Sequence, residues 1–361
     1  MIPRNCAALV VVCLALVGCA PSATPTPSPT TLPIEPVATV STTPSPVPSP
    51  IPTEGPIVAA DLDGLLVDRA LAHRLPLAVS IDDARAARPQ SGFNAASIVF
   101  HAPADGYETR YLMIFQEGDA TDIGPVRSAR IYLAQWAAEL QAGFAHYGGD
   151  LLTLRWLKGS EAGDLTNIDG MGAGSHAFHR ISTRSAPHNA YTNAAALWAM
   201  AAKLGGPSTT ADTVHLRPFR EDTPAADHPA SQSVTVPYRT VTVGYTYDRT
   251  SNSYLRALNG KAHVDPMDGR RVTARTVIVL SMPFRTDNNI ERGHNRPVLG
   301  SVGTGTAQVF MEGRVIAATW SKAGPLEPTL ILGPDGAELP LIRGRIFFEV
   351  VPTGTKITVR G

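Results

Sequence analysis

Cysteine is almost absent from this chain of 361 amino acids. Its three cysteines, Cys6, Cys13 and Cys19, lie at the N-terminal end, and none follows residue 19. Disulfides, thiol catalysis and cysteine-based metal sites are therefore excluded for the rest of the chain. A folded region of this size has to rest on its hydrophobic core instead.

The chain also lacks an excess of charge of either sign, because 31 Lys and Arg residues balance 31 Asp and Glu residues. A general nucleic-acid binder uses an overall positive field to attract the phosphate backbone. We therefore expect no nucleic-acid partner. The balance still allows a local basic site.

An apolar run long enough to span a membrane comfortably is missing as well, since CAALVVVCLALVG covers only residues 6–18. Arg4 precedes this run, and LVGC (Leu16–Cys19) ends it in a way that resembles the lipobox of bacterial lipoproteins. The similarity predicts a signal peptide over residues 1–19 and acylation of Cys19. The protein would then be extracytoplasmic and anchored to the cell membrane by its lipid. A plain secretory signal is the alternative.

Proline, threonine and serine dominate residues 20–56, where Glu35 and Glu54 are the only charged residues. Proline fixes the backbone and removes hydrogen-bond donors, so we expect no packed element there. At about 3.1 Å per residue in polyproline II, the segment would hold the folded part up to roughly 100 Å from the lipid. We predict a stalk, which differs little from a disordered spacer.

Strand and helix patterns mix over residues 57–205, which predicts an α/β domain. Apolar runs at 76–82, 96–103, 109–117 and 143–149 indicate strands. Helical patterns cover residues 59–75, 122–136 and 191–206. The last is the clearest, because Thr192 or Asn193 can cap it, alanine and leucine fill it and two glycines end it.

Turn-forming residues accumulate over residues 206–232, which we predict to be a linker. From residue 233 to residue 361, β-branched residues recur in alternating or apolar runs, and Asp335-Gly336 is a two-residue turn signal. No helical pattern follows Lys203. The expected fold is thus an α/β (mixed α+β) N-terminal domain followed by a smaller, mostly-β C-terminal domain.

Several segments resemble the YerB-like lipoproteins, which carry an N-terminal domain of unknown function and a companion C-terminal domain. They are RPQSGF (88–93), TRYLMIF (109–115), IGPVRSAR (123–130), HYGG (146–149), APHNAYT (186–192), YDRTSNSYLRALNGKAHVD (247–265), GTGTAQVFMEGRVIAATWSK (303–322) and GAELPLIRGRIFFEVVP (336–352). One departure is His179, where the family pattern has Trp. The resemblance implies export, lipid anchoring and the two-domain layout, but no established reaction.

The most specific of these segments carries two arginines. Within DIGPVRSARIYLAQW (122–136), Asp122 and Pro125 suit a helix start, which would place Arg127 and Arg130 on one face of its first turns. Cations there are unfavourable unless an anion joins them. We therefore expect an anion site, to which Arg88 and Arg110 contribute. The alternative is a structural network with Asp82, Asp83, Asp105 or Glu108.

Three further polar residues are candidates for ligand binding. His188 and Asn189 precede the alanine-rich helix, and His146 stands at the end of a predicted strand, where α/β domains often bind ligands. Each has a plain structural alternative, such as capping a helix or satisfying a loop carbonyl. His176, His179 and His188 lack the spacing of a helical zinc motif, so we expect no metal and no cofactor.

These observations favour a membrane-anchored lipoprotein that binds an anionic cell-envelope ligand, such as a cell-wall polymer carboxylate or phosphate, through an arginine cluster. A cell-wall hydrolase or transferase that uses Asp82, Asp83, Glu108 or His188 is the first alternative. A scaffold for another envelope protein is the second.

Overall fold

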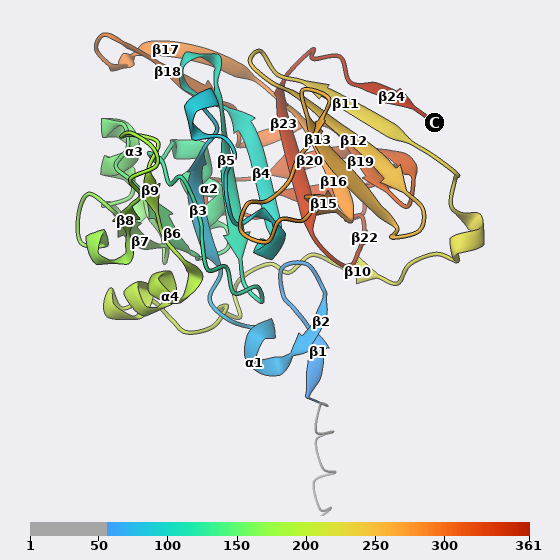
Figure 1. Ribbon diagram of the computed structural model, residues 1–361, viewed down its shortest axis with the longest axis horizontal. Coiled ribbons are helices and arrows are strands. Elements are labelled where there is room, and N and C mark those ends of the chain that lie inside the picture. The colour runs from blue at the N-terminus through green and yellow to red at the C-terminus, as the bar shows by residue number, and fades with distance from the viewer. Residues whose placement is uncertain (1–55) are drawn as a thin grey trace, which may run out of the picture. The chain divides into compact units, whose positions relative to one another are not determined.

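A mixed sheet of ten strands forms the centre of the structure, a computed structural model that describes residues 56–361 (Figure 1). The predicted signal peptide, Cys19 and the Pro-rich segment before Pro56 lie outside these residues. In spatial order the strands are β21 (Leu330–Leu332), β20 (Arg314–Lys322), β19 (Gly303–Met311), β16 (Thr276–Met282), β23 (Ile346–Pro352), β4 (Ile98–Pro103), β5 (Thr109–Phe115), β3 (Leu77–Asp82), β6 (Gly143–His146) and β7 (Thr166–Asp169).

This sheet takes strands from both predicted regions of the chain. Strand β23 pairs in parallel with β16 on one side and with β4 on the other, so it joins the C-terminal strands to the N-terminal ones. Six of its seven residues are buried, which agrees with its nearly continuous apolar sequence IFFEVVP. One sheet therefore contains strands from before and after the predicted linker.

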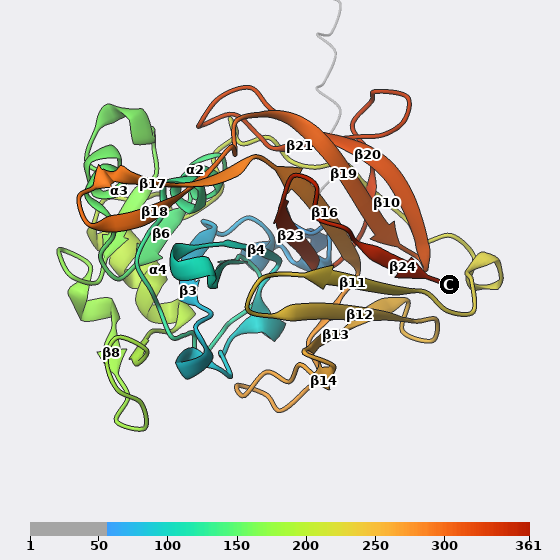
Figure 2. The ribbon, with the colours of Figure 1, turned by 90° about the horizontal axis from the view of Figure 1, so that it is seen from above.

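A second, antiparallel sheet packs beside the central one. Its order is β14 (Lys261–Ala262), β13 (Ser253–Leu258), β12 (Thr242–Asp248), β11 (Ser233–Pro237) and β24 (Thr358–Arg360), with β15 (Thr273–Ala274) also paired to β13. Figure 2 shows β11, β12 and β13 side by side. Four two-strand pairs complete the β-structure: β1 (Ile57–Ala59) with β2 (Leu66–Asp68), β8 (His179–Arg180) with β9 (Ala190–Tyr191), β10 (Phe219–Arg220) with β22 (Leu341–Ile342), and β17 (Phe284–Glu291) with β18 (His294–Leu299).

Two core clusters cover opposite faces of the central sheet. The α-helices of the described residues are α1 (Arg69–Ala72), α2 (Ile131–Ala138), α3 (Leu151–Trp156) and α4 (Ala194–Lys203). Successive residues of β3 point to opposite faces, so Ala78 belongs to the same core cluster as Trp136 of α2, while Val79 belongs to the same cluster as Leu197 of α4. Val243 of the second sheet belongs to the same cluster as Val79. One face thus carries α2, and the other carries α4 and the second sheet.

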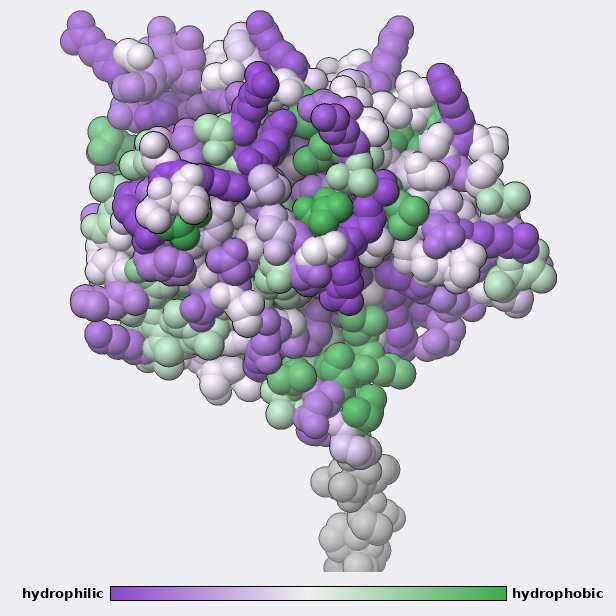
Figure 3. Space-filling model, in the orientation of Figure 1, coloured by the Kyte–Doolittle hydropathy of each residue, from purple (hydrophilic) through white to green (hydrophobic). Residues whose placement is uncertain are grey.

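The four strands predicted before residue 150 are confirmed as β3, β4, β5 and β6, and the helix predicted at 191–206 is confirmed as α4. Its N-cap is Asn193, whose side chain accepts a hydrogen bond from the Ala196 N–H at 2.8 Å. The helix predicted at 59–75 is wrong, because most of this segment forms the β1–β2 hairpin and only one turn, α1, is helical. The hairpin region leaves Ile57, Leu65 and Leu66 exposed, and Figure 3 shows apolar side chains gathered at this edge.

A fully buried charged network links the two sheets. Glu349 on β23 lies opposite His101 on β4, and its Oε2 is 2.8 Å from the Nδ1 atom of His101. Arg256 on β13 donates to the other oxygen, Oε1, at 3.2 Å. The Nε2 atom of His101 lies 3.2 Å from Oδ2 of Asp83, immediately after β3. Buried charges are tolerated only when they are paired in this way, so the network fixes the packing of the two sheets.

The network predicts a dependence of stability on acid. Burial alone would raise the pKa of Glu349, but the charges of His101 and Arg256 outweigh it and lower the pKa from 4.5 to about 2. A depressed folded-state pKa contributes stability above the unfolded value, which is lost as the pH falls from about 4.5 towards 2. We expect Glu349→Gln to lower the free energy of unfolding at neutral pH and to weaken this acid dependence, as measured by urea unfolding at several pH values.

Glu327→Gln is the matched control, because Glu327 is an exposed glutamate. It should leave both the stability and the acid dependence unchanged. An acid dependence of Glu349→Gln equal to that of the wild-type protein would contradict the role assigned to Glu349.

Candidate functional site

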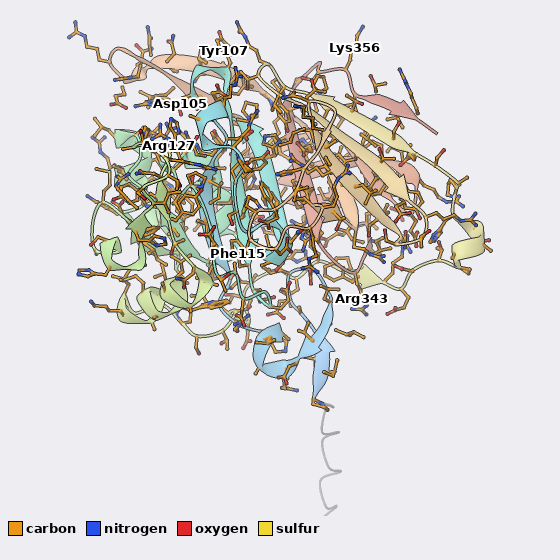
Figure 4. All side chains as sticks on the ribbon, in the orientation of Figure 1. Asp105, Tyr107, Phe115, Arg127, Arg343 and Lys356 are labelled. Atoms are coloured by element: carbon orange, nitrogen blue, oxygen red, sulfur yellow. The ribbon has the colours of Figure 1, made fainter. Side chains whose placement is uncertain are left out.

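A cleft of about 320 Å³ opens where strand β3 ends and strand β5 begins. Asp82, the last residue of β3, pairs in register with Arg110 on β5. Figure 4 shows Asp105 and Arg127 at this same end of the sheet, and both line the cleft. The charged lining residues are Arg110, Arg127, Arg130, Arg296, Asp82, Asp105 and Glu108. Three of the four predicted arginines therefore meet in one cleft.

The segment that carries two of these arginines is extended where we expected a helix. Ile123 pairs with Thr192 and Val126 pairs with Ile81 through isolated β-bridges, and α2 begins only at Ile131. The prediction that Asp122 caps a helix is therefore wrong. The backbone pairs on both sides with distant segments instead, which aligns residues 127 and 130 along the end of the sheet. Arg130 is the N-cap residue of α2, without a side-chain cap hydrogen bond, whereas Arg127 lies outside the helix.

Asp105 is the central counter-charge of the cleft. Its carboxylate accepts from Nε of Arg130 at 2.7 Å and also from Nη2 of the same residue. It accepts from Nη1 of Arg296 at 2.9 Å, and Nη2 of Arg110 lies 3.6 Å away. Burial favours a higher pKa for Asp105, but the charges of Arg130 and Arg110 outweigh it and lower the pKa. One carboxylate therefore contacts three guanidinium groups, of which Arg296 also pairs with Glu291.

Arg110 is the least compensated of these cations. Its side chain is only 7% exposed. Burial, with the neighbouring charge of Arg130, lowers the pKa of Arg110 to about 10, against the attraction of Asp105. Its Nη1 atom donates to the backbone oxygen of Ser128 at 2.8 Å, but its buried Nε atom has no hydrogen-bond partner. The protein thus holds a buried positive charge that its own carboxylates satisfy incompletely.

Asp82 joins two other predicted site residues at the edge of the cleft. Its Oδ2 atom lies 2.7 Å from Nδ1 of His188 and 3.3 Å from Nε of Arg127. The Nε of Arg127 makes no hydrogen bond despite its burial, whereas the side chain as a whole is 30% exposed. The charge of Asp82 therefore holds Arg127 at the cleft, and the Nε–H group of Arg127 remains without a hydrogen-bond partner.

The other predicted residues do not join the cleft. Arg88 donates from Nε to Asp83 at 2.8 Å, so this arginine has the structural partner that we named as the alternative. His146 is fully buried between the backbone oxygen of Gly148 and Oδ1 of Asn167, both at 2.8 Å from its ring nitrogens. Neither Arg88 nor His146 lines the cleft, and both serve local packing.

Asn189 also has a structural role. Its side-chain nitrogen donates to the backbone oxygens of Ile181 and Arg184, each at 3.1 Å, and its oxygen accepts from Arg180 at 2.5 Å. It therefore closes the loop that precedes β9 and orients the neighbouring His188.

Arg296 was not predicted as a site residue, although it lies on β18 and donates to Asp105 from a distant part of the chain. No local pattern marks it, because its partner is 191 residues away. Glu349 and Arg256 were missed as well. For these two a signal exists, namely a charged residue within the apolar runs IFFEVV and YLRAL.

Residues 56–361 contain no group of three or more His, Cys, Asp or Glu side chains that could hold a metal ion. In the same part of the chain, none of the helices has the length and apolar character needed to cross a membrane.

Comparisons with known proteins agree with the fold. Residues 62–207 match the family described as "Protein of unknown function (DUF3048) N-terminal domain", and residues 234–348 match its C-terminal domain. The chain is 31% identical to "Putative lipoprotein YerB" of Bacillus subtilis (strain 168) over 303 residues, which cover 81% of this chain and 86% of that protein. The crystal structure of the YerB protein from Bacillus subtilis superposes with a TM-score of 0.74 at 25% identity, covering 84% of this chain and all of that one. The chain, strand-rich with few helices and two matching family domains, therefore belongs to the YerB-like family.

Proposed function

We propose that the protein is an extracytoplasmic lipoprotein, anchored through Cys19, whose cleft binds a phosphate or carboxylate group of a cell-envelope polymer. The lipobox-like LVGC and the name of the Bacillus subtilis relative support the anchoring. We also retain the division into an α/β part and a smaller mostly-β part. It is supported by the four α-helices of the described residues, which all lie before residue 206.

The observation that carries the proposal is the incomplete compensation of Arg110. A buried guanidinium that lacks a partner for one N–H group destabilises the protein, and an anion in the cleft would remove that cost. Arg127 is more exposed and has an unpaired N–H group, so it can turn towards such an anion. The internal carboxylates leave the cleft open, with a volume suited to one small group of a polymer.

Arg127→Ala is the cleanest test of binding, since Arg127 contributes the least to the internal network. We expect this change to weaken binding to purified peptidoglycan that carries phosphate polymers by about tenfold, the typical loss of a charge-assisted hydrogen bond. Binding is measured by sedimentation of the protein with the polymer. Arg285→Ala removes an equal charge from a side chain that is 64% exposed, and it should bind as the wild-type protein does.

Stripping the phosphate polymers from the peptidoglycan with hydrofluoric acid separates the two anion sources. Loss of binding identifies phosphate, and retained binding identifies carboxylate. If Arg127→Ala and Arg285→Ala bind equally well to both preparations, the cleft is not the binding site.

Asp105→Asn tests whether an external anion can replace the internal one. Without the Asp105 charge, Arg110, Arg130 and Arg296 repel one another, so we expect a loss of about 1–3 kcal/mol in the free energy of unfolding. Added phosphate should raise the melting temperature of this variant more than that of the wild-type protein, as measured by thermal unfolding.

Asp287→Asn is the matched control, because Asp287 pairs with a single exposed arginine at the surface. Its melting temperature and its response to phosphate should stay close to those of the wild-type protein. A phosphate response of Asp105→Asn no larger than that of the wild-type protein would show that an external anion does not replace the Asp105 carboxylate.

One observation favours an enzyme as a second candidate. The contact between Nδ1 of His188 and Asp82 orients the imidazole and leaves its Nε2 atom as a potential base, as in catalytic His–Asp pairs. Under this hypothesis, incubation of the protein with peptidoglycan releases fragments that mass spectrometry detects. His188→Gln should abolish their release, whereas His179→Gln, at an exposed histidine, should not. No fragments from the wild-type protein over a wide pH range would reject the hypothesis.

A further inference from the structure

A second pocket, of about 560 Å³, lies where the loop after β3 meets the β13–β14 hairpin. Five of its ten lining residues are apolar, namely Pro89, Leu258, Ala262, Val264 and Pro266. It differs in chemistry from the charged cleft, with which it shares no lining residue. Its volume falls in the range of pockets that hold small organic ligands.

His263 lines this pocket and has an unpaired ring donor. Its Nδ1 atom lies 2.9 Å from Nη1 of Arg256, which can only donate, so Nδ1 accepts and the ring proton sits on Nε2. Burial, with the charge of Arg256, lowers the pKa of His263 well below its usual value, which keeps the ring neutral. The Nε2 atom is buried and has no hydrogen-bond partner.

Gln90 contributes an unpaired acceptor. Its side-chain nitrogen donates to the backbone oxygen of Asp82 at 2.9 Å and to Oδ1 of Asp83 at 2.6 Å, which uses both of its hydrogens. Its Oε1 atom is buried and has no partner. An unsatisfied buried polar atom is costly, so two in the lining of one pocket point to a ligand that supplies both complements.

The rim of the pocket is cationic. Lys261 is exposed there, and Arg88 lines the same pocket while its Nε and Nη2 atoms hold Asp83. A ligand that fits all these features has one carbonyl, one amide N–H, an apolar side chain and a carboxylate. A peptide C-terminus and an N-acylated amino acid share this set.

We propose that this pocket binds an N-acylated amino acid or the C-terminal residue of a peptide, with an apolar side chain. The ligand carbonyl accepts from Nε2 of His263, and the ligand N–H donates to Oε1 of Gln90. The apolar side chain packs against Leu258 and Val264, and the carboxylate lies near Lys261. The proposal is independent of anion binding in the cleft.

The test uses the full chain with ¹⁵N-labelled histidine and N-acetyl-L-leucine as the probe. The ring nitrogens of His263 should show the Nε2-protonated form, and the Nε2 signal should shift saturably as the probe is added. N-acetyl-L-leucine amide, which lacks the carboxylate, should bind about twofold to fivefold more weakly, the effect of one exposed ion pair.

Ala262→Trp fills the pocket at an exposed position and should abolish the shift. Ala226→Trp places the same bulk at an exposed alanine elsewhere and should leave it unchanged. Lys261→Glu, which reverses a surface charge without adding bulk, should weaken binding of N-acetyl-L-leucine by about tenfold. The absence of a saturable His263 shift in the wild-type protein would overturn the proposal, as would a shift that persists in Ala262→Trp.

Discussion

The buried ion pairs around Glu349 are the constraint on which the rest of the structure depends. Through them β23 is matched with β4, and the second sheet is held against the central one by Arg256. The apolar pocket is built from residues that this network positions. Asp83 holds Arg88 and Gln90 on one side, and Arg256 holds His263 on the other. The lining of the apolar pocket is therefore an extension of the buried network.

Such a network specifies a geometry more than it adds stability. Removing several charges from water costs free energy, which their mutual attraction offsets only when every partner is in place. The hydroxyl groups of Tyr238 and Tyr245 complete the set by donating to the two oxygens of Glu349 at 2.8 Å and 2.6 Å. A shifted register of β23 would leave Glu349 without these partners. The network thus selects one pairing of the two halves of the chain.

Much of the fold could be predicted because its signals are local. The apolar runs that form β3 to β6 and the capped, alanine-rich α4 are of this kind. The segment from Asp122 to Arg130 was misjudged because Pro125 and Asp122 suit a helix start, whereas pairing of Ile123 with Thr192 and of Val126 with Ile81 decides its conformation. Long-range pairing of this type leaves no local pattern. The same holds for Arg296, whose place in the cleft depends on a contact across most of the fold.

The candidate site was predicted in part, and the difference between Arg88 and Arg110 explains why. Both arginines stand near Asp82 or Asp83 at the end of β3, and their sequence context does not separate them. Arg88 donates to both carboxylate oxygens of Asp83, which is fully buried. Arg110 shares Asp105 with two other arginines and keeps an unpaired N–H group. A structural network and a ligand site are therefore not exclusive here, because the carboxylates that assemble the arginines leave the buried Nε atom of Arg110 without a hydrogen-bond partner. That unpaired N–H group, which only the folded arrangement creates, is the feature on which the proposed anion binding rests.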